Sequence, residues 1–287
     1  MRKFTTALLT GASLLLFTAC GSSGGSGGGS TTKTMVPITE ENADTVISST
    51  VQSISGIMEV GDITQSNDSS NIVKATTHLS KLGNIASANM EPGTLAESGT
   101  EQCSDGGSVS YNGNETSGGT VTFSQCEEYG TTINGTMTIS INGAETTTIM
   151  TNFSVKTSYA EVLYYSNATI DLNTNTYDMS VTATGYTIED GDRYDFENYS
   201  LTKSGNSYTF SGLIKTDCMG GWVEIKTNKA LVMTEYSCPT AGEIVSVGNN
   251  SELKMVFNAD MSVDISVNGN LYNTYSDCEE LPESVCD

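Results

Sequence analysis

Apolar and polar residues alternate with a period of two along much of this chain after residue 92. The pattern is clear at residues 133–141, 177–183 and 263–267, where Ile, Met, Val, Ala or Tyr alternates with Thr, Ser, Asn or Asp. Strict alternation is typical of antiparallel β-strands that place one face on a core and the other in water. The sequence therefore predicts a mainly β protein.

Dipeptides that favour tight turns lie mostly between the alternating runs. They are Asn112-Gly113, Asn142-Gly143, Asp190-Gly191, Ser204-Gly205 and Asn268-Gly269. Asn134-Gly135 instead falls inside one run, which indicates a β-bulge rather than a turn. We expect roughly twelve to fifteen short strands, a number at which open sheets curl, split or close. The predicted fold is a large antiparallel meander, either a sandwich or a curled half-barrel.

A helical period precedes the strands. Thr39 has the character of an N-cap, and apolar residues at helical spacing follow, which predicts a helix over about 40–58. A weaker pattern predicts a second helix over about 70–82. We expect one or two short helices, within a segment 37–92, to pack on the β-domain of residues 93–287.

The first residues have the layout of a secretory signal peptide. Arg2 and Lys3 precede an apolar run that ends at Phe17 and is too short to span a bilayer. The residues that follow, Phe17-Thr18-Ala19-Cys20, resemble the lipobox of bacterial lipoproteins, although Phe17 replaces the usual Leu. The resemblance implies that residues 1–19 are removed and that Cys20 is lipidated. It thus places the protein in the bacterial cell envelope, anchored to the membrane by its N-terminal lipid.

A Gly/Ser-rich stretch from Gly21 to Ser30 follows this cysteine. Its composition is that of a flexible linker, so we expect residues 20–36 to tether the folded part. Gly21, rather than Asp, after the lipidated cysteine resembles lipoproteins of the outer membrane in bacteria with two membranes.

Six cysteines remain after Cys20. An even number in an exported protein predicts three disulfides, although six cysteines allow fifteen pairings. Their spacing favours sequential pairs, because the first two pairs each bracket an expected hairpin. The predicted pairs are Cys103 with Cys126, Cys218 with Cys238 and Cys278 with Cys286.

The net charge and the residue types reduce the number of possible functions. The chain has 12 Lys and Arg against 34 Asp and Glu, with a formal net charge of −22 at pH 7, which excludes a nucleic-acid partner. A single histidine gives little basis for nucleophilic catalysis or a zinc site. We expect no cofactor, apart from a weak calcium candidate formed by Asp190, Asp192 and Asp195, which alternatively make an acidic hairpin tip.

Two classes of function fit this pattern. The first is a non-catalytic binding or structural module displayed on the envelope, which binds a macromolecule or surface through an acidic, Thr-rich face. The second is a carrier that holds an apolar ligand, such as a lipid, in a curled sheet. A hydrolase is a more distant alternative, and we expect the protein not to be an enzyme.

Overall fold

The computed structural model describes residues 33–61, 98–114, 117–128, 130–157, 162–189, 191–233 and 238–282. Of the side chains in these ranges, those of residues 54–61, 114, 157 and 189 are not described. The predicted second helix over 70–82 and the single histidine, His78, lie outside these ranges. Residues 33–287 form one compact unit, and Met1–Thr32 fall outside it.

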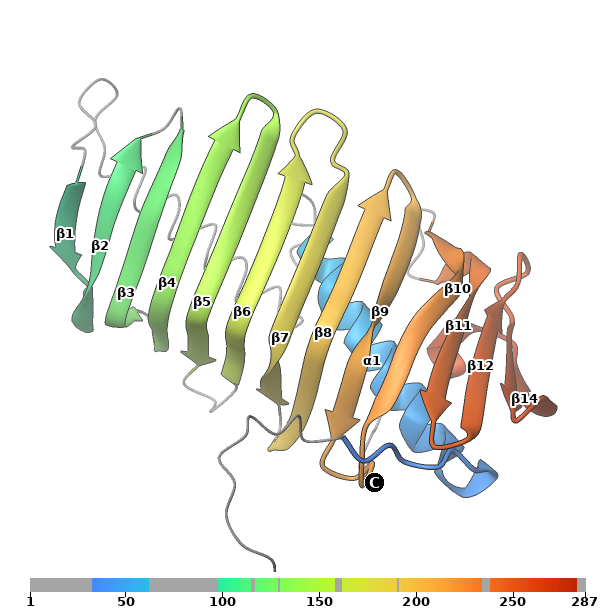
Figure 1. The fold of residues 1–287 in the computed structure, drawn as a ribbon. Helices are drawn as coiled ribbons and strands as arrows, with labels where there is room; N and C mark the ends of the chain where they lie inside the picture. The colour runs from blue at the N-terminus through green and yellow to red at the C-terminus, as the bar shows by residue number, and fades with distance from the viewer. Residues whose placement is uncertain are drawn as a thin grey trace, which may run out of the picture. The chain divides into compact units, whose positions relative to one another are not determined.

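A single antiparallel sheet of fourteen strands dominates the fold (Figure 1). Each strand pairs with the next one in the sequence, so the sheet is an uninterrupted meander that does not close. This confirms the predicted meander and strand number, but the strands form one sheet rather than the two layers of a sandwich. The strands are β1 (Ser98–Gln102), β2 (Gly106–Asn114), β3 (Gly118–Glu128), β4 (Thr131–Asn142), β5 (Glu145–Thr157), β6 (Val162–Asn173), β7 (Met179–Glu189), β8 (Asp192–Ser204), β9 (Ser207–Thr216), β10 (Val223–Met233), β11 (Pro239–Gly248), β12 (Ser251–Phe257), β13 (Val263–Val267) and β14 (Asn270–Tyr275).

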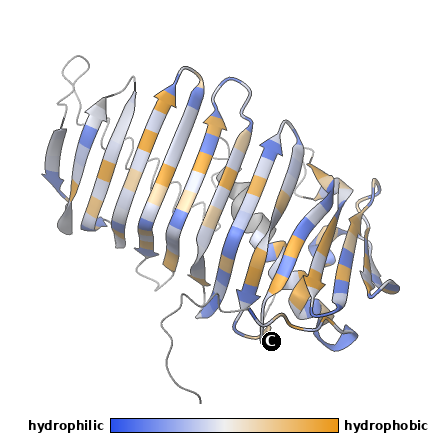
Figure 2. Ribbon diagram, in the orientation of Figure 1, coloured by the Kyte–Doolittle hydropathy of each residue, from blue (hydrophilic) through white to orange (hydrophobic). Residues whose placement is uncertain are grey.

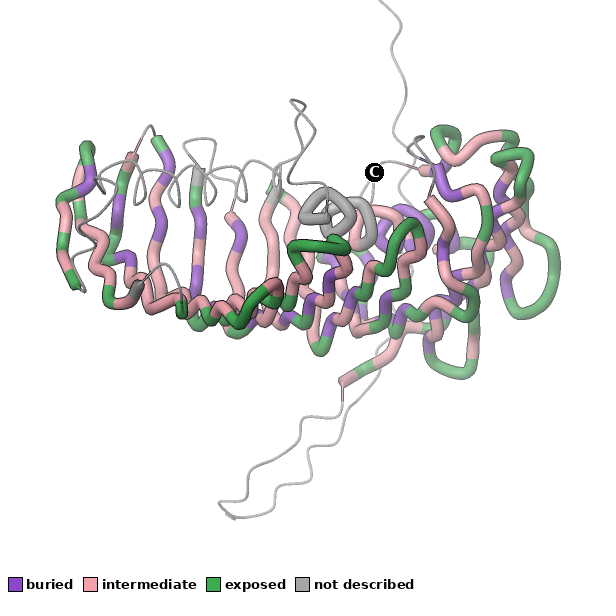
Figure 3. The backbone as a smooth tube through the Cα atoms, turned by 90° about the horizontal axis from the view of Figure 1, so that it is seen from above, coloured by how far each residue is buried: buried purple, intermediate pink, exposed green. Residues whose placement is uncertain are grey.

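Apolar and polar residues form alternating bands along the strands (Figure 2). Because successive residues of a strand point to opposite faces, the two faces of the sheet differ in polarity. We call the face on which the helix packs the inner face and the opposite one, which Figure 1 shows, the outer face. Buried apolar side chains form two clusters on the inner face, one over β2–β7 and one over β7–β13. Figure 3 marks the buried residues along the backbone. Phe153 is at the centre of the first cluster and is 0% exposed. The outer face carries mainly Thr, Ser, Asn and charged residues.

The helical segment begins where the sequence predicts. Thr39 is the N-cap of a short 3-10 helix (Glu40–Asn42), which leads into α1 (Ala43–Gly61). Val46 and Ile47 are buried against the sheet. Ser48, Ser49 and Thr50 are also buried. Their hydroxyls can be buried without loss of hydrogen bonding because they donate to carbonyls one turn earlier in the helix. The helix buries hydroxyl groups as well as an apolar stripe.

Residues just before the helix are attached to the sheet. Met35 forms a bridge with Trp222, and the Val36 N–H donates to the Trp222 carbonyl at 3.0 Å. Further along, the Ile38 N–H donates to Ser251 Oγ at 2.6 Å. The tether predicted for residues 20–36 therefore overlaps a segment that the sheet binds, which begins at Lys33.

Most of the predicted turns are confirmed. Asn142-Gly143, Ser204-Gly205 and Asn268-Gly269 each connect two neighbouring strands. Asn112-Gly113 lies instead within β2, so the turn prediction there is wrong. A Cβ atom on Gly113 would lie 2.4 Å from the Gly118 carbonyl oxygen, so this glycine permits a close approach of two strands.

A line of β-bulges crosses the sheet. Gln125, Asn152 and Asn198 have φ angles of 51°, 46° and 49°, and each lies at a register shift where its strand contains one extra residue. Asn134-Gly135 lies opposite the bulge at Asn152, which confirms that this dipeptide marks a bulge rather than a turn. The bulges preserve the inward orientation of apolar residues on both sides of the line.

The disulfides correct two of the predicted pairs. Cys103 bonds to Cys126, as predicted, but Cys238 bonds to Cys278. Cys218 is also disulfide-bonded, but its bond is not among those described. Cys286 lies outside the described residues. The predicted pairs Cys218–Cys238 and Cys278–Cys286 are therefore wrong.

Topology explains this error. Cys218 and Cys238 flank β10, which is one strand rather than a hairpin, so they lie at opposite ends of it. Four antiparallel strands, β11–β14, separate Cys238 from Cys278. Because an even number of antiparallel strands returns the chain to the end at which it started, these two cysteines meet.

No helix in the described ranges has the length and apolar character needed to cross a membrane.

Candidate binding surface

Uncharged polar side chains form rows across the outer face, perpendicular to the strands. Cross-strand pairing places one residue of a row on each successive strand, from β1 to β7 in the first row below and from β1 to β9 in the second, and we call these two rows the hydroxyl rows. The first consists of Thr100, Ser110, Thr122, Thr136, Thr151, Asn167 and Thr184. The second consists of Ser98, Asn112, Thr120, Thr138, Ile149, Thr169, Thr182, Ser200 and Ser211.

Some of these hydroxyls contact one another across the strands. Thr120 Oγ1 lies 3.2 Å from Thr138 Oγ1, and Thr122 Oγ1 lies 3.4 Å from Thr136 Oγ1. Such pairs fix the side-chain rotamers and contribute modestly to the pairing of the strands. A hydroxyl has one donor and two acceptor positions, so each retains capacity for a further hydrogen bond. The rows therefore present oriented donors and acceptors.

A shallow hollow of about 470 Å³ lies where both rows begin, on β1, β2 and β3. Six of its lining residues belong to the rows and the other two are Gly99 and Tyr111, so no charged side chain lines it. The residues that line it are Ser98, Gly99, Thr100, Ser110, Tyr111, Asn112, Thr120 and Thr122.

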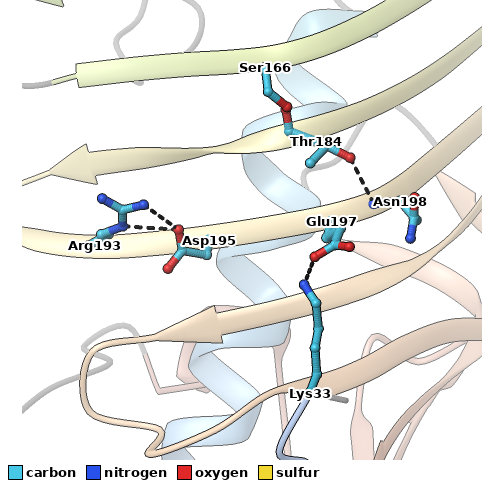
Figure 4. Close-up of polar contacts among 7 residues, drawn as sticks. All are labelled: Lys33, Ser166, Thr184, Arg193, Asp195, Glu197 and Asn198. Atoms are coloured by element: carbon cyan, nitrogen blue, oxygen red, sulfur yellow. Dashed lines mark hydrogen bonds and ion pairs between the residues drawn. The ribbon is translucent and has the colours of Figure 1, made fainter. Parts of the chain in front are cut away.

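Charged and aromatic residues cluster farther along the outer face. The Tyr164 and Tyr186 rings are 5.1 Å apart, and the Arg193 guanidinium lies 3.9 Å from the centre of the Tyr186 ring. Arg193 also donates two hydrogen bonds to Asp195 Oδ1, at 3.0 Å from Nε and 2.7 Å from Nη2 (Figure 4). The hydrogen bond to Asp195 raises the pKa of Arg193, despite an opposing effect of partial burial. This cluster is thus internally paired.

Lys33, which lies in the segment before the helix, also belongs to the charged cluster. Its ammonium group forms an ion pair with Glu197 (Figure 4). The same group lies 3.6 Å from the centre of the Trp222 ring. Burial lowers the pKa of Lys33, and the nearby Asp195 carboxylate partly opposes this effect. Lys33 lies over one face of the Trp222 ring. Trp222 therefore supports the start of the segment that precedes the helix.

The calcium candidate residues are not brought together. Asp192 and Asp195 are three residues apart on β8, so their side chains point to opposite faces of the sheet. Asp195 accepts both of its described hydrogen bonds from Arg193, and Asp190 lies outside the described residues. In the described part of the chain, the groups with metal-ligand spacing are centred on disulfide-bonded cysteines, whose sulfurs are not thiolates. The lipidation candidate Cys20 also lies outside the described residues.

Neither family models nor curated proteins nor solved structures match this chain. The function is therefore argued from the geometry of the surface alone.

The cross-strand rows and the hollow were not identified from the sequence. Thr and Ser at every second position showed that one face of each strand is polar, and this signal was available. The register between strands decides which polar residues are neighbours, and bulges such as Asn152 change that register without a clear sequence signal.

Proposed function

We propose that this protein is a lipid-anchored, non-catalytic module of the bacterial cell envelope that binds a macromolecule or surface through the outer face of its sheet. The observation that carries the proposal is the contrast between the two faces. The outer face presents a side chain of the second hydroxyl row on each strand from β1 to β9, whereas the inner face is the buried core. A wide polar surface with a filled core behind it is suited to binding large partners.

The burial of the inner face favours this function over a carrier of apolar ligands. Phe153 and Val155 are 0% and 2% exposed within a single chain. The hollow, by contrast, lies on the outer face, and the side chains that point into it from β1, β2 and β3 are hydroxyl and amide groups. An apolar ligand prefers a concave site lined mostly by apolar side chains. A lipid carrier remains the second candidate because the predicted lipid anchor would place the protein beside a membrane.

The charged cluster on the outer face also favours binding over hydrolysis. Asp195 and Glu197 are adjacent carboxylates on one face of β8, but Arg193 and Lys33 pair with them. A general acid must hold its proton within reach of the substrate, whereas these carboxylates are already occupied by cations of the same chain. We therefore assign these residues to the structure of the surface.

The proposed location is the envelope, with the outer membrane favoured over the inner one. Cys20 would carry the acyl chains, and several chains anchor a protein durably because each buried methylene contributes about 0.8 kcal/mol. The net charge of −22 is consistent with a partner that is neither nucleic acid nor an anionic lipid surface.

Replacing Cys20 with Ser tests the anchor. We expect the Cys20→Ser protein to move from the membrane fraction to the soluble fraction, because a hydroxyl cannot take part in thioether lipidation. Fractionation of cells followed by immunoblotting measures this shift, and Cys20-containing protein serves as the control. If the variant still sediments with membranes after a high-salt wash, the lipid anchor is wrong.

A further inference from the structure

The chemistry of the hollow at β1–β3 differs from that of the other end of the outer face. Hydroxyl and amide groups line the hollow, whereas the surface near β8 contains Arg193, Asp195 and Glu197. Hydroxyl and amide groups donate and accept hydrogen bonds, while a carboxylate only accepts and an ammonium only donates. The hollow therefore fits a ligand that is itself rich in groups that both donate and accept, and it offers no counter-charge to an ion.

The polar groups of the hollow are available to a ligand. The side chains of Ser98, Thr100, Ser110 and Asn112 make no hydrogen bond within the described residues. Thr120 and Thr122, on the neighbouring strand, are held by their contacts to Thr138 and Thr136. The hollow thus combines fixed hydroxyls on β3 with unpaired ones on β1 and β2.

A glycine shapes the edge of the hollow. Gly99 and Tyr111 are cross-strand partners, and a Cβ atom on Gly99 would lie 2.3 Å from Tyr111 Oη. The tyrosine can lie across β1 only because this position lacks a side chain. Because Gly99 and Tyr111 alternate with the row residues on β1 and β2, the Tyr111 side chain lies on the inner face and supports β1 behind the hollow.

The hydroxyl rows continue from the hollow across the sheet. Neighbouring strands lie about 4.8 Å apart, so the second hydroxyl row extends over roughly 40 Å from Ser98 to Ser211. A ligand that begins in the hollow can make repeated, similar contacts along this row on both sides of Ile149, which is the apolar member of the row, if it is an extended polymer with regularly spaced hydroxyl groups.

We propose that the hollow at β1–β3, together with the second hydroxyl row, binds an uncharged polysaccharide chain. The proposal rests on the function proposed above and specifies the class of its macromolecular partner. The hollow provides the first contacts, through Ser110, Asn112 and Thr120, and the row extends them.

Native affinity electrophoresis of the full chain in detergent tests this binding site. The gels contain dextran or galactomannan as neutral probes, or carboxymethylated dextran as the charged probe. We expect the neutral probes to retard the protein and the triple variant Ser110→Ala/Thr120→Val/Thr122→Val to bind them about tenfold more weakly or worse, because each hydrogen bond contributes modestly. The matched variant Thr202→Val/Ser207→Ala/Thr209→Val, on β8 and β9 and outside the second row, should stay within about twofold of the unaltered protein.

Several results would overturn the inference. They are no retardation by either neutral probe, stronger retardation by the charged probe, or an equal loss of binding in the β8–β9 variant. If the protein does not bind neutral polysaccharides but binds another envelope macromolecule through its outer face, this inference alone is wrong. A protein that instead holds an apolar molecule on its inner face overturns the proposed function as well.

Discussion

Replacing Gly135 with Ala is expected to destabilise the protein by about 3 kcal/mol or more. Gly135 has a φ of 119°, which alanine rarely adopts, and it lies opposite the bulge at Asn152. A Cβ atom there would lie 2.4 Å from the Asn152 carbonyl oxygen and 2.6 Å from Phe153 Cα. Both contacts are with backbone atoms of the neighbouring strand, so neither can be relieved by a change of rotamer.

Gly143 provides the matched control. It also has a positive φ, of 62°, but nothing lies within 4 Å of its Cβ position in the β4–β5 turn. Gly143→Ala should therefore cost only about 1 to 2 kcal/mol of conformational strain. Thermal unfolding with the disulfides intact measures the difference, at roughly 2 to 4 °C per kcal/mol for a protein of this size. Equal shifts of the midpoint for the two variants would contradict the bulge at Asn152 and its close approach to Gly135.

Replacing Phe153 with Ala should lower the free energy of unfolding by about 3 to 5 kcal/mol, because it removes a fully buried ring. Phe153 lies edge-to-face with Phe123, with ring centres 6.0 Å apart, at the centre of the inner-face cluster over β2–β7. Loss of the ring leaves a cavity that strands on both sides of β5 cannot fill without distortion.

Ile149 is on the same strand but on the outer face, where 44% of it is exposed. Ile149→Ala should cost about 1 kcal/mol or less, since nearly half of the side chain already contacts water. Urea denaturation followed by far-UV circular dichroism compares the two variants. If Ile149→Ala proves the more damaging of the two, the assignment of inner and outer faces is reversed.

The fold class could be predicted from the sequence because alternation is a local property. Residues 136–141 alternate without interruption, and they form the part of β4 that pairs with β5 without a register shift. Tyr177 shows the limit of such patterns: it continues the alternation of β7, yet it has a φ of 59° and is largely exposed just before that strand. Alternation of apolar and polar residues therefore cannot locate the first residue of a strand.

Long-range features could not be predicted in the same way. The pairing of Cys238 with Cys278 depends on the number of strands between them, and the predicted pair Cys218–Cys238 is wrong because β10 is one strand rather than a hairpin. The hollow depends on the register of β1, β2 and β3, which places Thr100, Ser110 and Thr122 side by side. Register is set by turns and bulges over many residues rather than by the composition of any one strand.

The most direct test of the account is native mass spectrometry of the folded Cys20→Ser protein, which lacks the lipid. A surface module whose core is filled by its own side chains should have the same mass under native and denaturing conditions. The contradicting result is a larger native mass that falls to the mass of the polypeptide on denaturation, which indicates a noncovalently bound lipid. If Met137→Asp or Ile139→Asp on the inner face abolishes that extra mass without unfolding the protein, the sheet is a carrier and its outer face is not the binding surface.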